Sequence, residues 1–102
     1  MEEPIAGYFD KELQRDVVKV APGAYFATAS DVVMVTVLGS CVAACLWDAR
    51  RRIGGMNHFM LPGPGDSARL GIYAMEVLIN RMLKCGADRR NLVHEEVPGV
   101  GK

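Results

Sequence analysis

The sequence lacks net charge, is poor in aromatic residues and contains no long hydrophobic run. Its 12 basic and 12 acidic residues cancel, so no global field attracts a nucleic acid or an anionic membrane. The longest uncharged run, 32–47, contains Thr36, Gly39 and Ser40, and it is shorter than the roughly 20 residues of a membrane-spanning helix. It also begins far from the first residue, unlike the apolar core of a signal peptide. These absences predict a cytoplasmic protein that neither binds nucleic acid nor inserts into a membrane.

Cysteine is also scarce. Cys41, Cys45 and Cys85 are odd in number and show no CxxC spacing, which argues against a disulfide framework and against a zinc site. A redox pair is disfavoured as well, because Cys41 and Cys45 on one strand would lie about 13 Å apart. We therefore expect a reducing compartment, one reactive thiol and no metal. The basic run 50–52 is interpreted as the cap of a solvated turn.

What the chain does contain is typical of one folded domain. It has 102 residues, of which 50% are hydrophobic and 24% are charged, a composition that permits a single modest core. We expect residues 1–102 to form one domain.

Short β-rich runs and one helical pattern predict an α+β fold. Residues 1–16 show no clean period and are interpreted as an irregular lead-in. Apolar spacing of three and four residues predicts a helix over 68–85, with Gly86 at its end. Residues 17–20 and 24–29 are interpreted as two strands joined by a tight bend, and the run 32–38 is interpreted as a buried strand. Further strands are predicted over 41–48, 53–62 and 91–97.

A β-hairpin is the simplest interpretation of the runs 41–48 and 53–62, and its register predicts a side-chain pair. If the turn is centred between Ala49 and Arg50, opposite residues have numbers that sum to a constant, and Cys41 faces His58. Their Cβ atoms would then be about 4.5–5.5 Å apart. A slip of one residue would separate the two side chains.

A thiol beside an imidazole is a nucleophile with its base, because the imidazole can accept the thiol proton. Attack on a carbonyl is the natural reaction of such a pair. The corner formed by Gly39, Ser40 and Cys41 could present backbone N–H groups to the developing oxyanion. The alternatives are structural: a buried cysteine commonly acts as a small hydrophobe, and His58 could be a satisfied core histidine.

Two motifs in this hairpin resemble a known family. The stretch TVLGSCVAACLWD at 36–48 and the stretch IGGMNHFMLPG at 53–63 resemble the signature of the CheD family of chemoreceptor glutamine deamidases. Similarity extends outward over 8–28 and 69–92. The resemblance implies a CheD-like α/β sandwich in which a catalytic β-hairpin packs near one long helix. From about His94 the sequence departs from the family, and the family's C-terminal strands are missing.

The resemblance also implies the roles of individual residues. Cys41 falls on the family's nucleophile, His58 on its general base and Thr36 on its third catalytic residue, although a threonine there could simply be a strand former. The implied reaction is hydrolysis of the side-chain amide of specific glutamines in the cytoplasmic helices of methyl-accepting chemotaxis receptors, giving glutamate. The resemblance implies no metal and no organic cofactor, and it implies a CheC-type phosphatase as a partner.

A second interpretation stays open beside the enzyme. The chain could be a non-catalytic module that binds a receptor or a CheC-type phosphatase without turnover. A sheet deprived of its later strands also has an unpaired edge, which predicts a homodimer through that edge or marginal stability.

Overall fold

The computed structural model describes residues 6–37, 41–60 and 67–98, and these residues form an α+β fold. This confirms the predicted fold class. The elements in chain order are β1 (Ala6–Asp10), β2 (Arg15–Lys19), β3 (Tyr25–Thr28), β4 (Val32–Val35), β5 (Cys41–Asp48), β6 (Ile53–Met60), α1 (Ser67–Lys84), the 3₁₀ turn η1 (Arg89–Asn91) and β7 (Leu92–Pro98).

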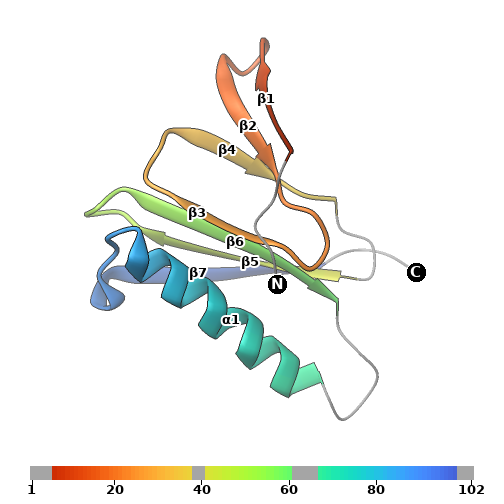
Figure 1. Cartoon of the computed structure of the whole chain (residues 1–102), viewed down its shortest axis with the longest axis vertical. Coiled ribbons are helices and arrows are strands. Elements are labelled where there is room, and N and C mark those ends of the chain that lie inside the picture. Colours follow the sequence, from red (N-terminus) through yellow and green to blue (C-terminus); the bar gives the residue numbers. More distant parts are fainter. Residues whose placement is uncertain (1–5, 38–40, 61–66, 99–102) are drawn as a thin grey trace.

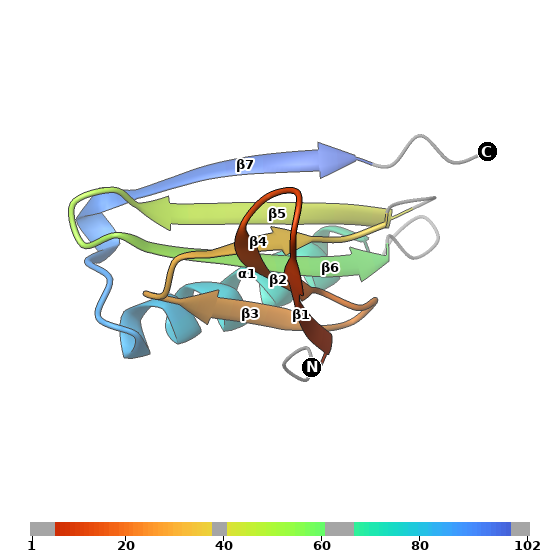
Figure 2. The same ribbon diagram turned by 90° about the horizontal axis from the view of Figure 1, so that it is seen from above.

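The strands form two sheets, and α1 completes a third layer. The larger sheet has the order β3-β6-β5-β7, and the smaller has the order β1-β2-β4. Figure 1 shows the helix below the larger sheet and the smaller sheet above it, and Figure 2 shows β4 lying across β5 and β6. Two neighbouring glycines of β6 mark the two interfaces: a Cβ atom on Gly54 would meet Met34 of β4, and one on Gly55 would meet Met82 of α1.

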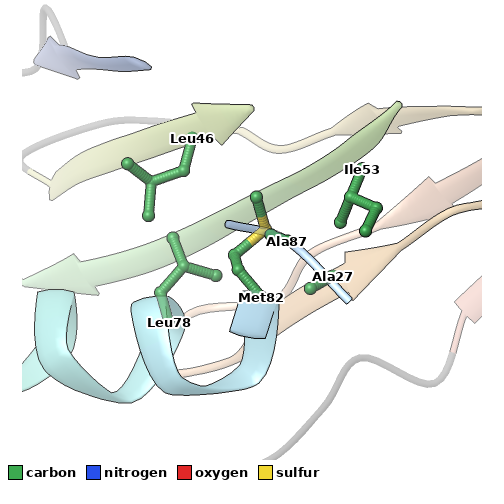
Figure 3. Packing of buried hydrophobic residues seen from close by; sticks show 6 residues of the cluster. All are labelled: Ala27, Leu46, Ile53, Leu78, Met82 and Ala87. Carbon is green, nitrogen blue, oxygen red and sulfur yellow. The ribbon is translucent and has the colours of Figure 1, made fainter. Parts of the chain in front are cut away.

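The main core lies between the larger sheet and α1 (Figure 3). Leu78 and Met82 are fully buried on the helix and point toward the sheet. Gly55 allows this close approach, because a Cβ atom there would lie 2.6 Å from Met82 Sδ and 3.1 Å from the carbonyl oxygen of Phe26. The buried residues of this cluster are Ala27, Leu46, Ile53, Leu78, Met82 and Ala87.

The predicted hairpin of β5 and β6 is confirmed, but its predicted register was wrong by two residues. Cys41 is opposite Met60, and His58 is opposite Ala43. The connection is a four-residue turn over 49–52, in which Arg52 has a φ of 59°. The turn fills the gap between the two predicted strands, but its centre lies between Arg50 and Arg51 rather than between Ala49 and Arg50. The carboxylate of Asp48 accepts the backbone N–H of Arg51 across it at 3.0 Å.

Three other sequence predictions need correction. The segment 1–16 is not wholly irregular, because β1 pairs with β2 in an antiparallel ladder. The strands predicted over 17–20 and 24–29 are not partners, since β2 and β3 lie in different sheets. The run predicted as a buried strand over 32–38 forms the half-buried β4 over 32–35, parallel to β2.

The helix and the last strand are confirmed with shifts of about one residue. Gly86 follows α1 with a φ of 108°, as expected for a glycine at a helix C-terminus. Among residues 6–37, 41–60 and 67–98, no helix has both the length and the apolarity needed to cross a membrane.

Candidate active site

His58 is a buried side chain on the face of β6 that is turned toward the smaller sheet. It has 1% of its surface exposed, and it shares this face with Gly54, which contacts β4. Its backbone is fixed on the β3 side: His58 N donates to Ala24 O at 3.1 Å, and His58 O accepts from Gly23 N at 2.8 Å. The position of the ring is thus set by the middle of a sheet rather than by a loop.

Thr36, just after β4, brings the two sheets together at the imidazole. Its Oγ1 donates to the backbone oxygen of Val20 at 2.7 Å and lies 2.7 Å from His58 Nδ1. A hydroxyl has one proton, and the Val20 carbonyl can only accept it. Thr36 Oγ1 must therefore accept a hydrogen bond from His58 Nδ1, which places the ring proton on Nδ1.

This tautomer leaves the lone pair of the other ring nitrogen, Nε2, available as a base. His58 Nε2 is buried and has no hydrogen-bond partner among the residues that the structure describes. A buried polar atom without a partner is rare in native proteins and calls for an explanation. The lone pair of Nε2 can therefore accept a proton or a hydrogen bond from a group that the described residues do not supply.

Cys41 is the first residue of β5, and the structure describes its backbone but not its side chain. It lies two residues before Ala43, which is directly opposite His58. An offset of two residues keeps Cys41 on the same face of the sheet as His58. Such diagonal neighbours are about 7–8 Å apart between backbones. The structure thus keeps the two residues near each other, although not as the directly facing pair that the sequence predicted.

The predicted oxyanion residues cannot be placed. Gly39 and Ser40 lie outside the described residues, so their role stays a prediction.

Sequence reasoning missed Asn57, a fully buried amide next to His58. Its Oδ1 accepts the backbone N–H of Ala44 at 3.0 Å, and its Nδ2 donates to the backbone oxygen of Ala74 at 3.1 Å. One side chain therefore ties β6 to β5 and to α1 beside His58. An asparagine in the middle of an otherwise apolar strand was the available signal, because such a residue has to find partners when buried.

The other two cysteines have environments that suit structural roles. Burial, followed by the nearby charge of Glu95, raises the pKa of Cys45 and so favours its neutral thiol. Cys85 donates from Sγ to the backbone oxygen of Ala27 at 3.6 Å. Within the described part of the chain, no three histidine, cysteine or acidic side chains gather as a metal site would require.

Comparison with known proteins finds close relatives over most of the chain. A protein from Shewanella oneidensis named "Probable chemoreceptor glutamine deamidase CheD 1" is 51% identical over 102 aligned residues, which cover 92% of this chain and 49% of that protein. A protein of the same name from Albidiferax ferrireducens is 58% identical over 83% of this chain and 38% of its own length.

A third relative, from a Janthinobacterium species, is named "Probable chemoreceptor glutamine deamidase CheD" and is 55% identical over 83% of this chain and 46% of its own length. The chain thus spans less than half the length of these curated relatives. No family model matches the chain.

Proposed function

Since the chain is homologous to the CheD family over most of its own length, we propose that it carries the reactive residues of a protein-glutamine deamidase. The substrates in this proposal are glutamine side chains of methyl-accepting chemotaxis receptors, which are converted to glutamate. Cys41 is the nucleophile, His58 is the general base and acid, and Thr36 positions the imidazole.

The observation that carries the proposal is the state of the His58 ring. Its Nδ1 is held by Thr36 at 2.7 Å, and its buried Nε2 has no partner among the described residues. A catalytic base needs a defined tautomer and a free lone pair. A histidine that served only to fill the core would be expected to satisfy both nitrogens.

In the first half of the reaction, His58 Nε2 takes the proton of the Cys41 thiol, and the thiolate attacks the carboxamide carbon of the glutamine. The imidazolium then returns the proton to the nitrogen of the tetrahedral intermediate. The C–N bond breaks, ammonia leaves, and a glutamyl thioester remains on Cys41. Nδ1 keeps its proton and its hydrogen bond to Thr36 in both ring states.

In the second half, His58 Nε2 takes a proton from a water molecule, whose oxygen attacks the thioester carbonyl carbon. The C–S bond breaks, glutamate is released, and the proton returns to the Cys41 thiolate. The same nitrogen therefore serves each half-reaction, and the residues described require no change of tautomer.

The direct experiment incubates the chain with purified cytoplasmic fragments of methyl-accepting receptors and follows conversion of glutamine to glutamate by mass spectrometry. We expect conversion by the wild-type chain and none by Cys41→Ala. Cys45→Ala is the matched control, because it removes a thiol from the same strand, and it should retain activity. Conversion by Cys41→Ala would contradict the proposal.

The partners of the site are part of the same proposal. A wild-type chain that bound the receptor fragments without converting them would favour the non-catalytic module instead.

We also propose, from the sequence, that the chain binds a CheC-type phosphatase and that two chains pair through an open sheet edge. The edge strands of the larger sheet within the described residues are β3 and β7, and sedimentation velocity would detect a dimer formed through either of them.

A further inference from the structure

The end of the sheet opposite to Cys41 is rich in arginine. Arg50, Arg51 and Arg52 lie in the turn between β5 and β6, and Arg89 and Arg90 lie in η1. Figure 2 shows this turn and the segment before β7 at the same end of the molecule. β5 runs from Cys41 to Asp48, so this end lies about 23 Å from the candidate active site. Although the net charge of the chain is zero, this end of the sheet is therefore strongly basic.

A hollow of about 480 Å³ lies among these residues, lined by Arg50, Arg51, Asp88, Arg90 and Asn91. Its size falls within the range of about 300–1,000 Å³ that is usual for small-molecule sites. Three arginines and Asp88 give its lining a net charge of +2, which the buried carboxylate of Asp48 behind it reduces to +1. The remaining positive charge favours an anion.

The walls of the hollow are joined by a buried carboxylate. Asp48 is fully buried and accepts the backbone N–H groups of Arg51 at 3.0 Å and Asp88 at 2.8 Å. Asn91 Nδ2 approaches the same carboxylate at 3.4 Å. Asp48 thus holds the turn over 49–52 against the segment over 88–91, so the two sources of arginine are fixed relative to each other.

Two of the three guanidinium groups are also held in place. Arg90 donates through Nε and Nη2 to the two oxygens of Asp88 at 3.1 and 2.8 Å, and Arg51 Nη1 donates to Gly86 O at 3.2 Å. Each of these groups keeps further N–H donors, because a guanidinium has five. The side chain of Arg50 makes no hydrogen bond or ion pair with the other residues that the structure describes.

We propose that the hollow lined by Arg50, Arg51 and Arg90 binds a small phosphate-bearing molecule. The planar guanidinium of arginine matches a pair of phosphate oxygens and binds them with two charge-assisted hydrogen bonds. Arg50 supplies a guanidinium that has no partner among the described residues. Asp88 is paired with Arg90, so its negative charge is not left unpaired toward the ligand. This site is separate from the deamidase residues and does not depend on their activity.

Isothermal titration calorimetry of the chain with pyrophosphate and with ATP, at constant ionic strength, tests the proposal. The informative variant is Arg50→Gln, which removes the uncommitted guanidinium. The matched control is Arg89→Gln, because Arg89 carries the same charge in η1 but lines a different hollow with Glu76, Ile79 and Asn80.

We expect saturable binding that Arg50→Gln weakens about tenfold, as the loss of a charge-assisted hydrogen bond predicts, while Arg89→Gln leaves the Kd within about twofold. Equal affinity for pyrophosphate and ATP would assign the recognition to the phosphate groups alone, and tighter binding of ATP would add contacts to the rest of the nucleotide. Equal losses in the two variants would mean diffuse attraction and would overturn the proposal. An absence of saturable binding to either probe would also overturn it.

Discussion

Replacing Thr36 by valine removes the hydroxyl that connects the two sheets at His58 while nearly preserving the shape of the side chain. Two hydrogen bonds of 2.7 Å are lost. The carbonyl of Val20, a residue with no exposed surface, then has no hydroxyl donor. His58 Nδ1 loses the acceptor that fixed its proton, so the neutral ring is free to move that proton to Nε2.

The magnitude follows from the burial of these groups. An orphaned buried polar group costs about 1–3 kcal/mol, and the ring recovers part of its own loss by changing tautomer. We therefore expect Thr36→Val to lower the free energy of unfolding by about 2 kcal/mol. For a chain of this size, that change lowers Tm by roughly 8–16 °C. It also lowers the rate, because a base with the wrong tautomer cannot accept the thiol proton.

The assay combines urea unfolding with deamidation kinetics on receptor fragments. Positioned acid–base groups contribute about 10²–10⁴-fold to a rate, and we expect Thr36→Val to lower kcat by about the smaller factor with KM nearly unchanged. Thr36→Ser is the control, since it keeps the hydroxyl and should retain most of both stability and kcat. Wild-type stability and kcat in Thr36→Val would refute the reasoning, and so would equal losses in the serine variant.

Two further predictions concern the scaffold. Gly55→Ala places a methyl group against Met82 and should lower the free energy of unfolding by about 1–3 kcal/mol. Gly54→Ala should change this free energy far less, because its Cβ atom meets its nearest atom at 3.4 Å. Equal losses in the two variants, measured by urea unfolding, would contradict this packing. Burial alone would raise the pKa of Asp48, but hydrogen bonds from the backbone of Asp88 and Arg51 lower it. The charged form of Asp48 therefore stabilises the fold at pH values above the unfolded pKa of about 3.9. This contribution is lost as the pH falls through the lowered pKa of the folded state. Asp48→Asn should therefore be less stable than the wild type at pH 7, and the difference should shrink under acid; a difference that grew on acidification would contradict the assignment.

The elements of the hairpin and the helix were predictable because burial imposes a period on their residues. The centre of the turn was not, because Asp48 accepts the backbone N–H groups of Arg51 in the turn and of Asp88, which lies 40 residues further along the chain. A shift of two residues in register still preserved the face shared by Cys41 and His58. The pattern therefore predicted that Cys41 and His58 share a face, but it misjudged how they face each other.

The first strand escaped prediction for the opposite reason. Tyr8 and Phe9 in β1 are more than half exposed, so burial imposes no alternation on that segment. The contact between Thr36 and His58 joins residues 22 positions apart and requires the two sheets to pack together. Local sequence pattern carries no trace of such packing, and only the family resemblance pointed to Thr36. The proposed anion site was likewise not predictable from the basic run over 50–52, because the hollow also needs residues of η1.

The central claim is that His58 activates Cys41, and the pH dependence of Cys41 alkylation tests it most directly. Iodoacetamide labelling, with the modified cysteine identified by peptide mass spectrometry, separates Cys41 from the other two thiols. In the wild-type chain we predict half-maximal reactivity well below the ordinary thiol pKa of about 8.5. In His58→Gln we predict a return to about that ordinary value. Profiles that coincide in the two proteins would contradict the account.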